Sequence, residues 1–195
     1  MAKPEVSSTR LDTRFGEFDF YCFTWGPHEE DNVLVQVRRP FKLPTLVRVQ
    51  SACYTAEIFR SLDCDCHEQL ELSLKRIAAE GGALVYMLAD GRGAGLQIKV
   101  KGLELGRTLG LDTAEAYERL GVPPDPREYD RAAYVLSYLE ISSIKLLTNN
   151  PRKVAGLMAQ GLEVTREALE IPPTDKSRPY LATKRSKMGH LLTKA

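Results

Sequence analysis

The sequence predicts a mixed α/β (α+β) protein, in which a β-rich N-terminal part precedes alternating strands and helices around a mixed sheet. Three observations predict this class. The first 52 residues hold short runs rich in β-branched and aromatic residues. From Gln69 the apolar residues follow helical spacing, and farther on unbroken apolar runs of strand length alternate with helical segments. At 195 residues the chain can form one domain with its own core.

The expected elements follow one another with turn-forming residues between them. Three strands are expected in the first part, at 18–25, 33–37 and 46–49. The rest of the pattern predicts a helix at 69–80, a buried strand at 83–88, a glycine-rich turn at 90–95, helices at about 112–120 and 131–139, a buried strand at 144–147 and a helix that begins at Pro151. We expect residues 1–171 to form a single domain, followed by a basic tail at 172–195 with a short helix.

The net charge of +1 gives no global indication of a nucleic-acid partner, so any anion site must be a local cluster of basic side chains. No apolar run approaches the roughly 20 residues that a membrane span needs. The N-terminal residues lack the hydrophobic segment typical of a signal peptide. We therefore expect a cytoplasmic protein without a nucleic-acid or membrane partner. Because cytoplasmic thiols stay reduced, clustered cysteines favour metal ligands or catalytic groups over disulfides.

Three of the four cysteines lie close together, with the spacing Cys53-x10-Cys64-x-Cys66. Three thiolates are a full protein ligand set for a catalytic zinc, which keeps its fourth position for water. Two other interpretations stay open. His67 follows Cys66 and could complete a structural Cys3His site, or the cysteines could be ordinary core residues. Cys22 lies in an apolar run and is expected to be a small buried side chain.

Four further polar clusters have no obvious packing role, and the first two lie at expected strand ends in the first half of the chain. Arg48 and Gln50 share one face of a strand, for which the alternative is a solvated strand face. The turn at 90–95 follows a buried strand, where ligand loops often lie in α/β sheets. Its glycines let backbone N–H groups approach an anion, and Arg92 adds a forked donor. The alternative is an ordinary turn.

The other two clusters lie in the second half of the chain. Asp125 and Arg127 are two residues apart, a spacing that usually gives a weak surface ion pair. The segment 148–153 leaves a buried strand and opens a helix, a geometry that suits a phosphate, with Thr148 and Lys153 as further donors. The alternative is a capped helix with Lys153 in solvent.

Taken together, these clusters resemble GTP cyclohydrolase II, the enzyme family that starts riboflavin synthesis. The resemblance covers nearly the whole chain from about Arg10. The matching segments keep the family's order and approximate separation: RVQSAC at 48–53, SLDCDC at 61–66 with Gln69, DGRGAGL at 90–96, DT at 112–113, DPR at 125–127, LLTNNP at 146–151 with Lys153, and KMGHLL at 187–192. Each motif alone is weak, whereas the ordered set with three cysteines is specific.

The resemblance implies a mechanism. Zinc held by Cys53, Cys64 and Cys66 would activate water to attack C8 of guanine in GTP; the imidazole ring opens, formate leaves, and the product is a diaminopyrimidinone ribosyl phosphate. Arg127 matches the arginine proposed to attack the α-phosphate and expel pyrophosphate, and Asp125 matches its carboxylate partner, described as a proton acceptor. Because the pKa of arginine stays above about 12, electrostatic stabilisation of the α-phosphate is an equal interpretation for Arg127.

The resemblance also implies how the nucleotide is bound. The positions that match nucleotide contacts are Arg48, Val49, Gln50, Ser51, Ala52, Gln69, Asp90, Gly91, Arg92, Thr113, Thr148 and Lys153. Mg²⁺ would neutralise the triphosphate, and the family works as a homodimer. Residues 1–171 would then be the catalytic domain. The basic tail, with Lys184, Arg185 and Lys187, would either close over the substrate or stay a mobile solvated end.

The sequence departs from the family's pattern close to the expected chemistry. Gln50 and Ala52 stand where the family usually has His and Glu, and His67 replaces a common glycine. The turn at 90–95 reads DGRGAG in place of EGRNIG. A tyrosine expected in the following helix is missing, with Leu103 or a neighbour at its position. That tyrosine is thought to help release formate, so ring opening could stop at the formamidopyrimidine nucleotide.

Three hypotheses about function follow. The first is a cyclohydrolase that acts on GTP. The second is the same zinc chemistry on another purine nucleotide, because base recognition could have changed with the lost His and Glu. The third is a non-catalytic nucleotide-binding module with a structural Cys3His zinc. The retained Asp125 and Arg127 argue against the third hypothesis, since a structural module has no need of that pair.

Overall fold

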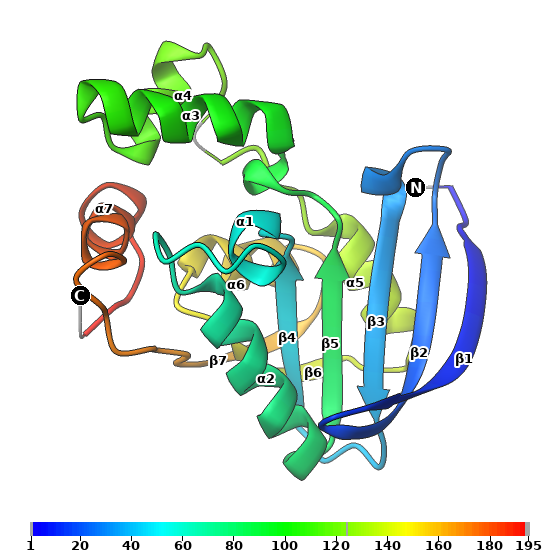
Figure 1. The fold of residues 1–195 in the computed structure, drawn as a ribbon. Helices are drawn as coiled ribbons and strands as arrows, with labels where there is room; N and C mark the ends of the chain where they lie inside the picture. Colours follow the sequence, from blue (N-terminus) through cyan, green and yellow to red (C-terminus); the bar gives the residue numbers. More distant parts are fainter. Residues whose placement is uncertain (1, 124, 194–195) are drawn as a thin grey trace. The chain divides into compact units, whose positions relative to one another are not determined.

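The computed structural model describes residues 2–123 and 125–193. Within them, seven strands form one sheet in the order β1-β2-β3-β5-β4-β6-β7 (Figure 1). The strands span Glu5–Thr13 (β1), Gly16–Thr24 (β2), Asn32–Arg38 (β3), Thr45–Ser51 (β4), Gly82–Met87 (β5), Ser143–Leu147 (β6) and Glu163–Glu167 (β7). β1, β2, β3 and β5 pair antiparallel, whereas β4, β6 and β7 pair parallel. The sheet is therefore mixed, as predicted.

Helices alternate with the strands in the later part of the chain. They are α1 (Tyr54–Glu57), α2 (Cys66–Glu80), α3 (Leu96–Leu109), α4 (Thr113–Arg119), α5 (Asp130–Tyr138), α6 (Pro151–Met158) and α7 (Arg178–Met188), with short 3-10 turns at Glu29–Asp31 and Gly91–Gly93. The α/β class predicted from the sequence is confirmed. Among the described residues, no helix combines the length and the apolar character that crossing a membrane requires.

The contacts within the chain form two compact units. Unit 1 consists of residues 1–50, 70–88 and 128–169, and unit 2 consists of residues 51–69, 89–127 and 170–195. Unit 1 thus contains the sheet apart from Ser51, together with α5, α6 and most of α2, whereas unit 2 contains α1, α3, α4 and α7. This grouping of contacts does not test the expectation of a single domain at 1–171 followed by a tail.

Alternation along the strands builds a core on both faces of the sheet in unit 1. One cluster joins Val35 and Val85 to Leu136 of α5, and a second cluster joins Leu84 to Ile77 of α2. Because neighbouring residues of a strand point to opposite faces, α5 covers one face and α2 covers the other (Figure 1). These layers fix β4 beside its parallel neighbour β6, so that polar residues at the carboxyl ends of both strands come together.

The short helix α1 was not predicted, and β1, β7 and α3 also lack a clear signal in the sequence. β1 and β7, with the sequences EVSSTRLDT and EVTRE, are mostly exposed edge strands, so they lack the apolar runs that predict a strand. α3 carries a glycine in its middle, where helices usually avoid it. That residue, Gly102, is buried, and a Cβ there would meet Cε1 of Tyr117 at 3.2 Å. The missing side chain therefore allows α3 to pack closely on α4.

The expectation that Cys22 is a buried side chain is wrong. Cys22 lies in β2, as expected, but its side chain is only half-buried. Its Sγ lies 3.7 Å from Oγ1 of Thr24. The residue is on a strand of the antiparallel edge of the sheet, where one face remains partly open to solvent.

Candidate active site

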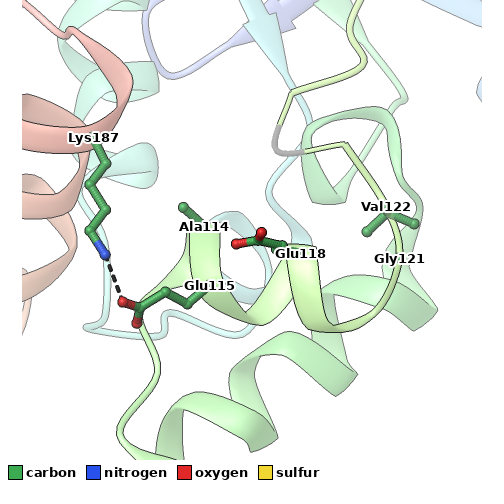
Figure 2. A pocket seen from close by; sticks show the side chains of 6 residues that line it. All are labelled: Ala114, Glu115, Glu118, Gly121, Val122 and Lys187. Carbon is green, nitrogen blue, oxygen red and sulfur yellow. Dashed lines mark hydrogen bonds and ion pairs between the residues drawn. The ribbon is translucent and has the colours of Figure 1, made fainter.

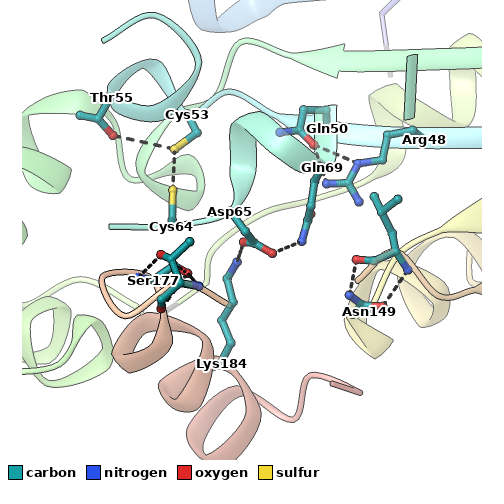
Figure 3. Close-up of polar contacts among 12 residues, drawn as sticks. Arg48, Gln50, Cys53, Thr55, Cys64, Asp65, Gln69, Asn149, Ser177 and Lys184 are labelled. Carbon is teal, nitrogen blue, oxygen red and sulfur yellow. Dashed lines mark hydrogen bonds and ion pairs between the residues drawn. The ribbon is translucent and has the colours of Figure 1, made fainter. Parts of the chain in front are cut away.

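The three clustered cysteines come from two segments of unit 2. Cys53 directly precedes α1, and Cys64 and Cys66 lie where the chain enters α2, which begins at Cys66 rather than at Gln69. Their Sγ atoms all lie within 4.8 Å of one another, and those of Cys53 and Cys64 are 3.8 Å apart (Figure 3). Tetrahedral zinc with Zn–S bonds of about 2.3 Å places two sulfurs about 3.8 Å apart. The donor set therefore fits a zinc ion.

His67 is not part of this group of ligand atoms among the described residues. Its ring faces Arg60 instead, with Nη1 of Arg60 3.0 Å from Nε2 of His67. The arrangement gives no support to a closed Cys3His site. It leaves the three thiols as the candidate ligands, the number that a catalytic zinc takes from its protein.

A partly buried lysine lies against one of the thiols. Nζ of Lys99, on α3, donates to Sγ of Cys53 at 3.1 Å and to Oδ1 of Asp90 at 2.8 Å. Hydrogen bonds from the thiols of Cys64 and Cys66 hold the pKa of Cys53 far below its ordinary value, and the Lys99 ammonium lowers it further. The same contacts with Cys53 raise the pKa of Cys64 to about 12. The ammonium group of Lys99 thus lies beside Sγ of Cys53 and favours the ionised form of this thiol.

Asp90 ties the glycine-rich turn to the cysteine segment. Its Oδ2 accepts a hydrogen bond from the backbone N–H of Tyr54 at 2.8 Å, and its Oδ1 accepts from Lys99 and from the backbone N–H of Gly91. The side chain is 3% exposed. Asp90 thus holds Lys99 in place and caps the turn, which is a structural role beside the nucleotide contact that the family resemblance implies.

The turn itself has a left-handed backbone. Gly91, Arg92 and Gly93 have φ values of 59°, 58° and 86°, a region that favours glycine. For Arg92 this conformation is uncommon, and such residues gather at functional loops. The guanidinium of Arg92 lies 5.7 Å from the ring centroid of Tyr117 and 5.8 Å from that of Tyr180. The two aromatic rings hold the arginine in one position beside the turn.

Asp125 and Arg127 form a forked ion pair. Nε and Nη2 of Arg127 donate to Oδ1 and Oδ2 of Asp125 at 2.6 and 2.7 Å, and Nη1 lies 3.4 Å from Oγ of Ser51. The two side chains are only 2% and 11% exposed. The usual interpretation of this spacing, a weak surface pair, is therefore wrong. A largely buried forked pair holds its guanidinium in a fixed orientation.

Asp65, Gln69 and Lys184 form a second buried polar group in unit 2. Nε2 of Gln69 donates to Oδ2 of Asp65 at 2.6 Å, and Nζ of Lys184 lies 3.3 Å from Oδ1 (Figure 3). Burial alone would lower the pKa of Lys184, but the Tyr180 phenol, the Asp65 carboxylate and the cysteine thiols raise it above its ordinary value. Lys184 belongs to α7, so part of the basic tail is folded against the segment that bears the cysteines.

Thr113, another expected nucleotide contact, opens α4 next to a different cation of the tail. Asp112 caps the helix, and its carboxylate and that of Glu115 both bind Lys187. A surface pocket of about 530 Å³ lies beside this contact (Figure 2). Its lining residues are Ala114, Glu115, Glu118, Gly121, Val122 and Lys187. None of the predicted site residues lines this pocket.

The expected nucleotide contacts at the carboxyl ends of β4 and β6 belong to unit 1. Nε of Arg48 donates to Oε1 of Gln50 at 2.9 Å, and Nη1 donates to the carbonyl of Leu147 at 2.8 Å. Nζ of Lys153 donates to the carbonyl of Val49 at 2.6 Å. The side chains of Arg48, Gln50 and Lys153 are buried. The alternatives of a solvated strand face and a solvated lysine are therefore wrong.

The remaining predicted contacts include Val49 and Thr148 of unit 1 and Ser51 and Ala52 of unit 2. Thr148 follows β6, is buried, and accepts the backbone N–H of Asn150 through Oγ1 at 3.1 Å. Asn150 in turn caps α6 by accepting the N–H of Arg152. Val49 and Ala52 are buried, whereas Ser51 is half-buried. Two residues of the site, Lys99 and Asp65, were not predicted, and Lys184 was expected only as one of the cations of a basic tail. The position of Asp65 between two cysteines was the one signal that could have indicated it.

The fold and this site define a class, an α/β protein with a candidate metal-dependent active site built on three thiols and a forked Asp–Arg pair. A family model described as GTP cyclohydrolase II matches residues 4–168. The chain belongs to the GTP cyclohydrolase II family. Its similarity to this family confirms the resemblance found in the sequence.

Individual relatives agree with the family model. The chain is 42% identical over 187 residues to GTP cyclohydrolase-2 of Picrophilus torridus, covering 95% of this chain and 97% of that protein. It is 50% identical over 191 residues to the riboflavin biosynthesis protein RibBA of Bacillus mycoides, and 43% identical over 194 residues to RibBA of Endomicrobium trichonymphae. These matches cover 96% and 97% of this chain but 48% of each RibBA protein. The chain thus spans about half the length of several relatives.

We expect the substitution Lys99→Met to weaken zinc binding by the thiol cluster about 10- to 100-fold, the range found when a residue that contacts a metal ligand is removed. The reason is that methionine cannot supply the positive charge that lies 3.1 Å from Sγ of Cys53. Zinc affinity is measured by competition with a chromophoric chelator. Lys101→Met, at an exposed position of the same helix, is the matched control. Equal affinities for the two variants would contradict a role for Lys99 at the thiols.

Proposed function

We propose that the chain hydrolyses GTP, opening the imidazole ring of guanine at C8 with release of formate, and releasing pyrophosphate from the triphosphate. The observation that carries this proposal is the cluster of three cysteine thiols within 4.8 Å of one another in a chain of this family. Cys53, Cys64 and Cys66 are the residues that would hold zinc. Bound zinc supplies Lewis-acid activation of water at neutral pH.

The proposed reaction consumes one water molecule for each bond that breaks. These bonds are the two C8–N bonds of the guanine ring, whose carbon leaves as formate, and the bond between the α-phosphorus and the pyrophosphate oxygen. Lys99 offsets the negative charge of the thiolates through its contact with Cys53, and Asp90 fixes the position of Lys99. The positive charge beside Cys53 is therefore already in place before substrate binds.

Asp125 and Arg127 would act at the α-phosphate. Asp125 holds the guanidinium of Arg127 by two hydrogen bonds, so the position and orientation of this positively charged group are fixed. Such a group stabilises the negative charge that develops as pyrophosphate leaves. Attack by Arg127 on the α-phosphorus, with Asp125 as proton acceptor, is the alternative that the family resemblance offers.

The other predicted contacts would bind the nucleotide. We assign Arg48, Thr148 and Lys153 to the triphosphate because each carries a basic or hydroxyl group. Arg48 lies in β4, Thr148 directly follows β6, and Lys153 lies in the first turn of α6, after the carboxyl end of β6. Nine other residues would bind the remaining parts of the nucleotide, or bind its phosphates through their backbone N–H groups. They are Val49, Gln50, Ser51, Ala52, Gln69, Asp90, Gly91, Arg92 and Thr113. Mg²⁺ would accompany the triphosphate and neutralise part of its charge.

The proposal extends to the assembly and its location. Residues 1–171 would form the catalytic domain, and two chains would form a homodimer as the family resemblance implies. The basic tail at 172–195 would take part in the site through α7, because Lys184 is already folded against Asp65. The three free thiols fit the reducing conditions of the cytoplasm.

A second outcome of the same chemistry is arrest at the formamidopyrimidine nucleotide. The observation that favours it is Leu103, near the position where the family has a tyrosine, which offers no proton donor and lies 43% exposed on α3. In that case the first C8–N bond breaks but formate is retained. The identity of the product decides between the two outcomes.

The proposed function is tested by incubating the purified, zinc-loaded protein with GTP and Mg²⁺. Mass spectrometry identifies the nucleotide product, and enzymatic assays quantify formate and pyrophosphate. We expect formate and pyrophosphate in a 1:1 ratio to the pyrimidine product. Pyrophosphate without formate would indicate the arrested reaction, and turnover of ATP but not of GTP would favour another purine substrate. Zinc bound by four protein ligands, without turnover of any purine nucleotide, would favour the non-catalytic module.

A further inference from the structure

Asp65 is a buried carboxylate between two candidate metal ligands. Its side chain is 4% exposed, and its two oxygens bind different parts of unit 2. Oδ2 accepts a hydrogen bond from Nε2 of Gln69 at 2.6 Å, within the first turn of α2. Oδ1 lies 3.3 Å from Nζ of Lys184, which is 119 residues farther along the chain (Figure 3). Asp65 thus connects the tail helix α7 to the side chain of Gln69.

This contact determines the orientation of the Gln69 amide. A carboxylate accepts hydrogen bonds only, so the NH₂ group of Gln69 must face Asp65. The carbonyl Oε1 lies on the other side of the planar amide and faces away from Asp65. The bond to Asp65 therefore favours the orientation in which Gln69 has its acceptor on the far side.

Lys184 supplies the positive charge that compensates the buried carboxylate of Asp65. A carboxylate away from water is retained when an opposite charge and hydrogen bonds compensate it. The side chain of Lys184 is itself 11% exposed, and its Nζ lies 4.3 Å from the ring centroid of Tyr180. By contrast Lys187, on the same helix, is 43% exposed. Lys184 is therefore anchored in the interior of unit 2, whereas Lys187 lies at the surface.

We propose that Lys184 and Asp65 are positioning residues for purine recognition, which hold Gln69 with its carbonyl oxygen towards the hydrogen-bond donors of guanine. The proposal rests on the proposed function. Guanine carries N1–H and a 2-amino group on one edge, whereas N1 of adenine is an acceptor. A fixed carbonyl acceptor favours the first pattern and opposes the second. The tail helix then contributes to the choice of base without touching the nucleotide.

Steady-state kinetics of the full-length, zinc-loaded protein test this inference. We expect Lys184→Met to raise KM for GTP about tenfold and to change kcat less than about twofold, since loss of one oriented hydrogen bond is worth roughly a factor of ten in binding. Lys184→Arg, which keeps the charge, should restore most of the affinity. Lys176→Met, an exposed lysine of the tail, is the control and should leave KM unchanged.

A double-mutant cycle with Gln69→Ala separates positioning from general damage to the fold. If Lys184 acts through Gln69, Lys184→Met should add less than about twofold to KM in the Gln69→Ala background. Multiplicative effects of the two substitutions, or an unchanged KM for Lys184→Met, would overturn the inference while leaving the proposed function intact. Absence of GTP turnover in the wild-type protein would remove both.

Discussion

The substitution Cys64→Ser should abolish zinc binding and turnover of GTP together. A serine hydroxyl stays protonated near neutral pH, whereas the thiolate is the form of cysteine that binds metal. Changes to residues around a metal ligand already cost 10- to 100-fold in affinity, so loss of a ligand should cost more than about 100-fold. Zinc per chain, measured by mass spectrometry after dialysis, should fall from one to nearly zero. Formate release should fall below about one hundredth of the wild-type rate.

Cys22→Ser is the matched control for this prediction. Cys22 lies half-buried in β2 and belongs to unit 1, whereas the thiol cluster belongs to unit 2. Both serine variants should keep the circular dichroism spectrum of the wild-type protein, and Cys22→Ser should keep its zinc and its rate. If Cys64→Ser retained both zinc and turnover, the assignment of the three cysteines to a metal site would be wrong.

The substitution Arg127→Lys should lower kcat about 100- to 1,000-fold, the loss seen when one preorganised donor to a developing negative charge is removed. Lysine keeps the positive charge but cannot make the two parallel hydrogen bonds that join Arg127 to Asp125. It is preferable to Arg127→Ala, which would leave the buried Asp125 carboxylate without its charge partner and destabilise the fold. Pyrophosphate release measures the effect.

Arg107→Lys is the control. Arg107 also donates two hydrogen bonds to one carboxylate, that of Glu104, but it does so at an exposed position of α3. Its kcat should remain within about twofold of wild type, as expected for a surface pair of little energetic weight. Rapid quenching with GTP labelled at the α-phosphate distinguishes the two roles of Arg127. A labelled adduct on Arg127 would support nucleophilic attack, and its absence with normal turnover would support electrostatic stabilisation.

Much of the fold could be predicted because most elements carry a local signal. The strands β2 to β6 combine apolar or alternating residues with clear turn signals between them, and Pro151 marks the start of α6. β1 and β7 carry no such signal, since edge strands with both faces largely solvated need no apolar pattern. The missing signal in α3 has a tertiary cause, which is the packing of Gly102 against Tyr117.

The candidate site was predictable in part for a similar reason. The spacing of Cys53, Cys64 and Cys66 indicated a shared ligand set, and the structure brings their Sγ atoms together. Lys99 lies 46 residues from Cys53 in the sequence, and Lys184 lies 119 residues from Asp65. Neither lysine differs in its local sequence from a solvated one. Their contacts depend on where α3 and α7 pack, which no local pattern encodes.

The sequence by itself determined the α/β class, the order of most elements, the three-thiol cluster and membership of the GTP cyclohydrolase II family. Periodicity and spacing are properties of near neighbours, so they can be read without a structure. The tertiary structure alone decided that the Asp125–Arg127 pair is largely buried rather than at the surface, and that Lys99 and Lys184 bind buried partners. Burial and pairing arise from contacts between distant segments, and these form only when the chain packs.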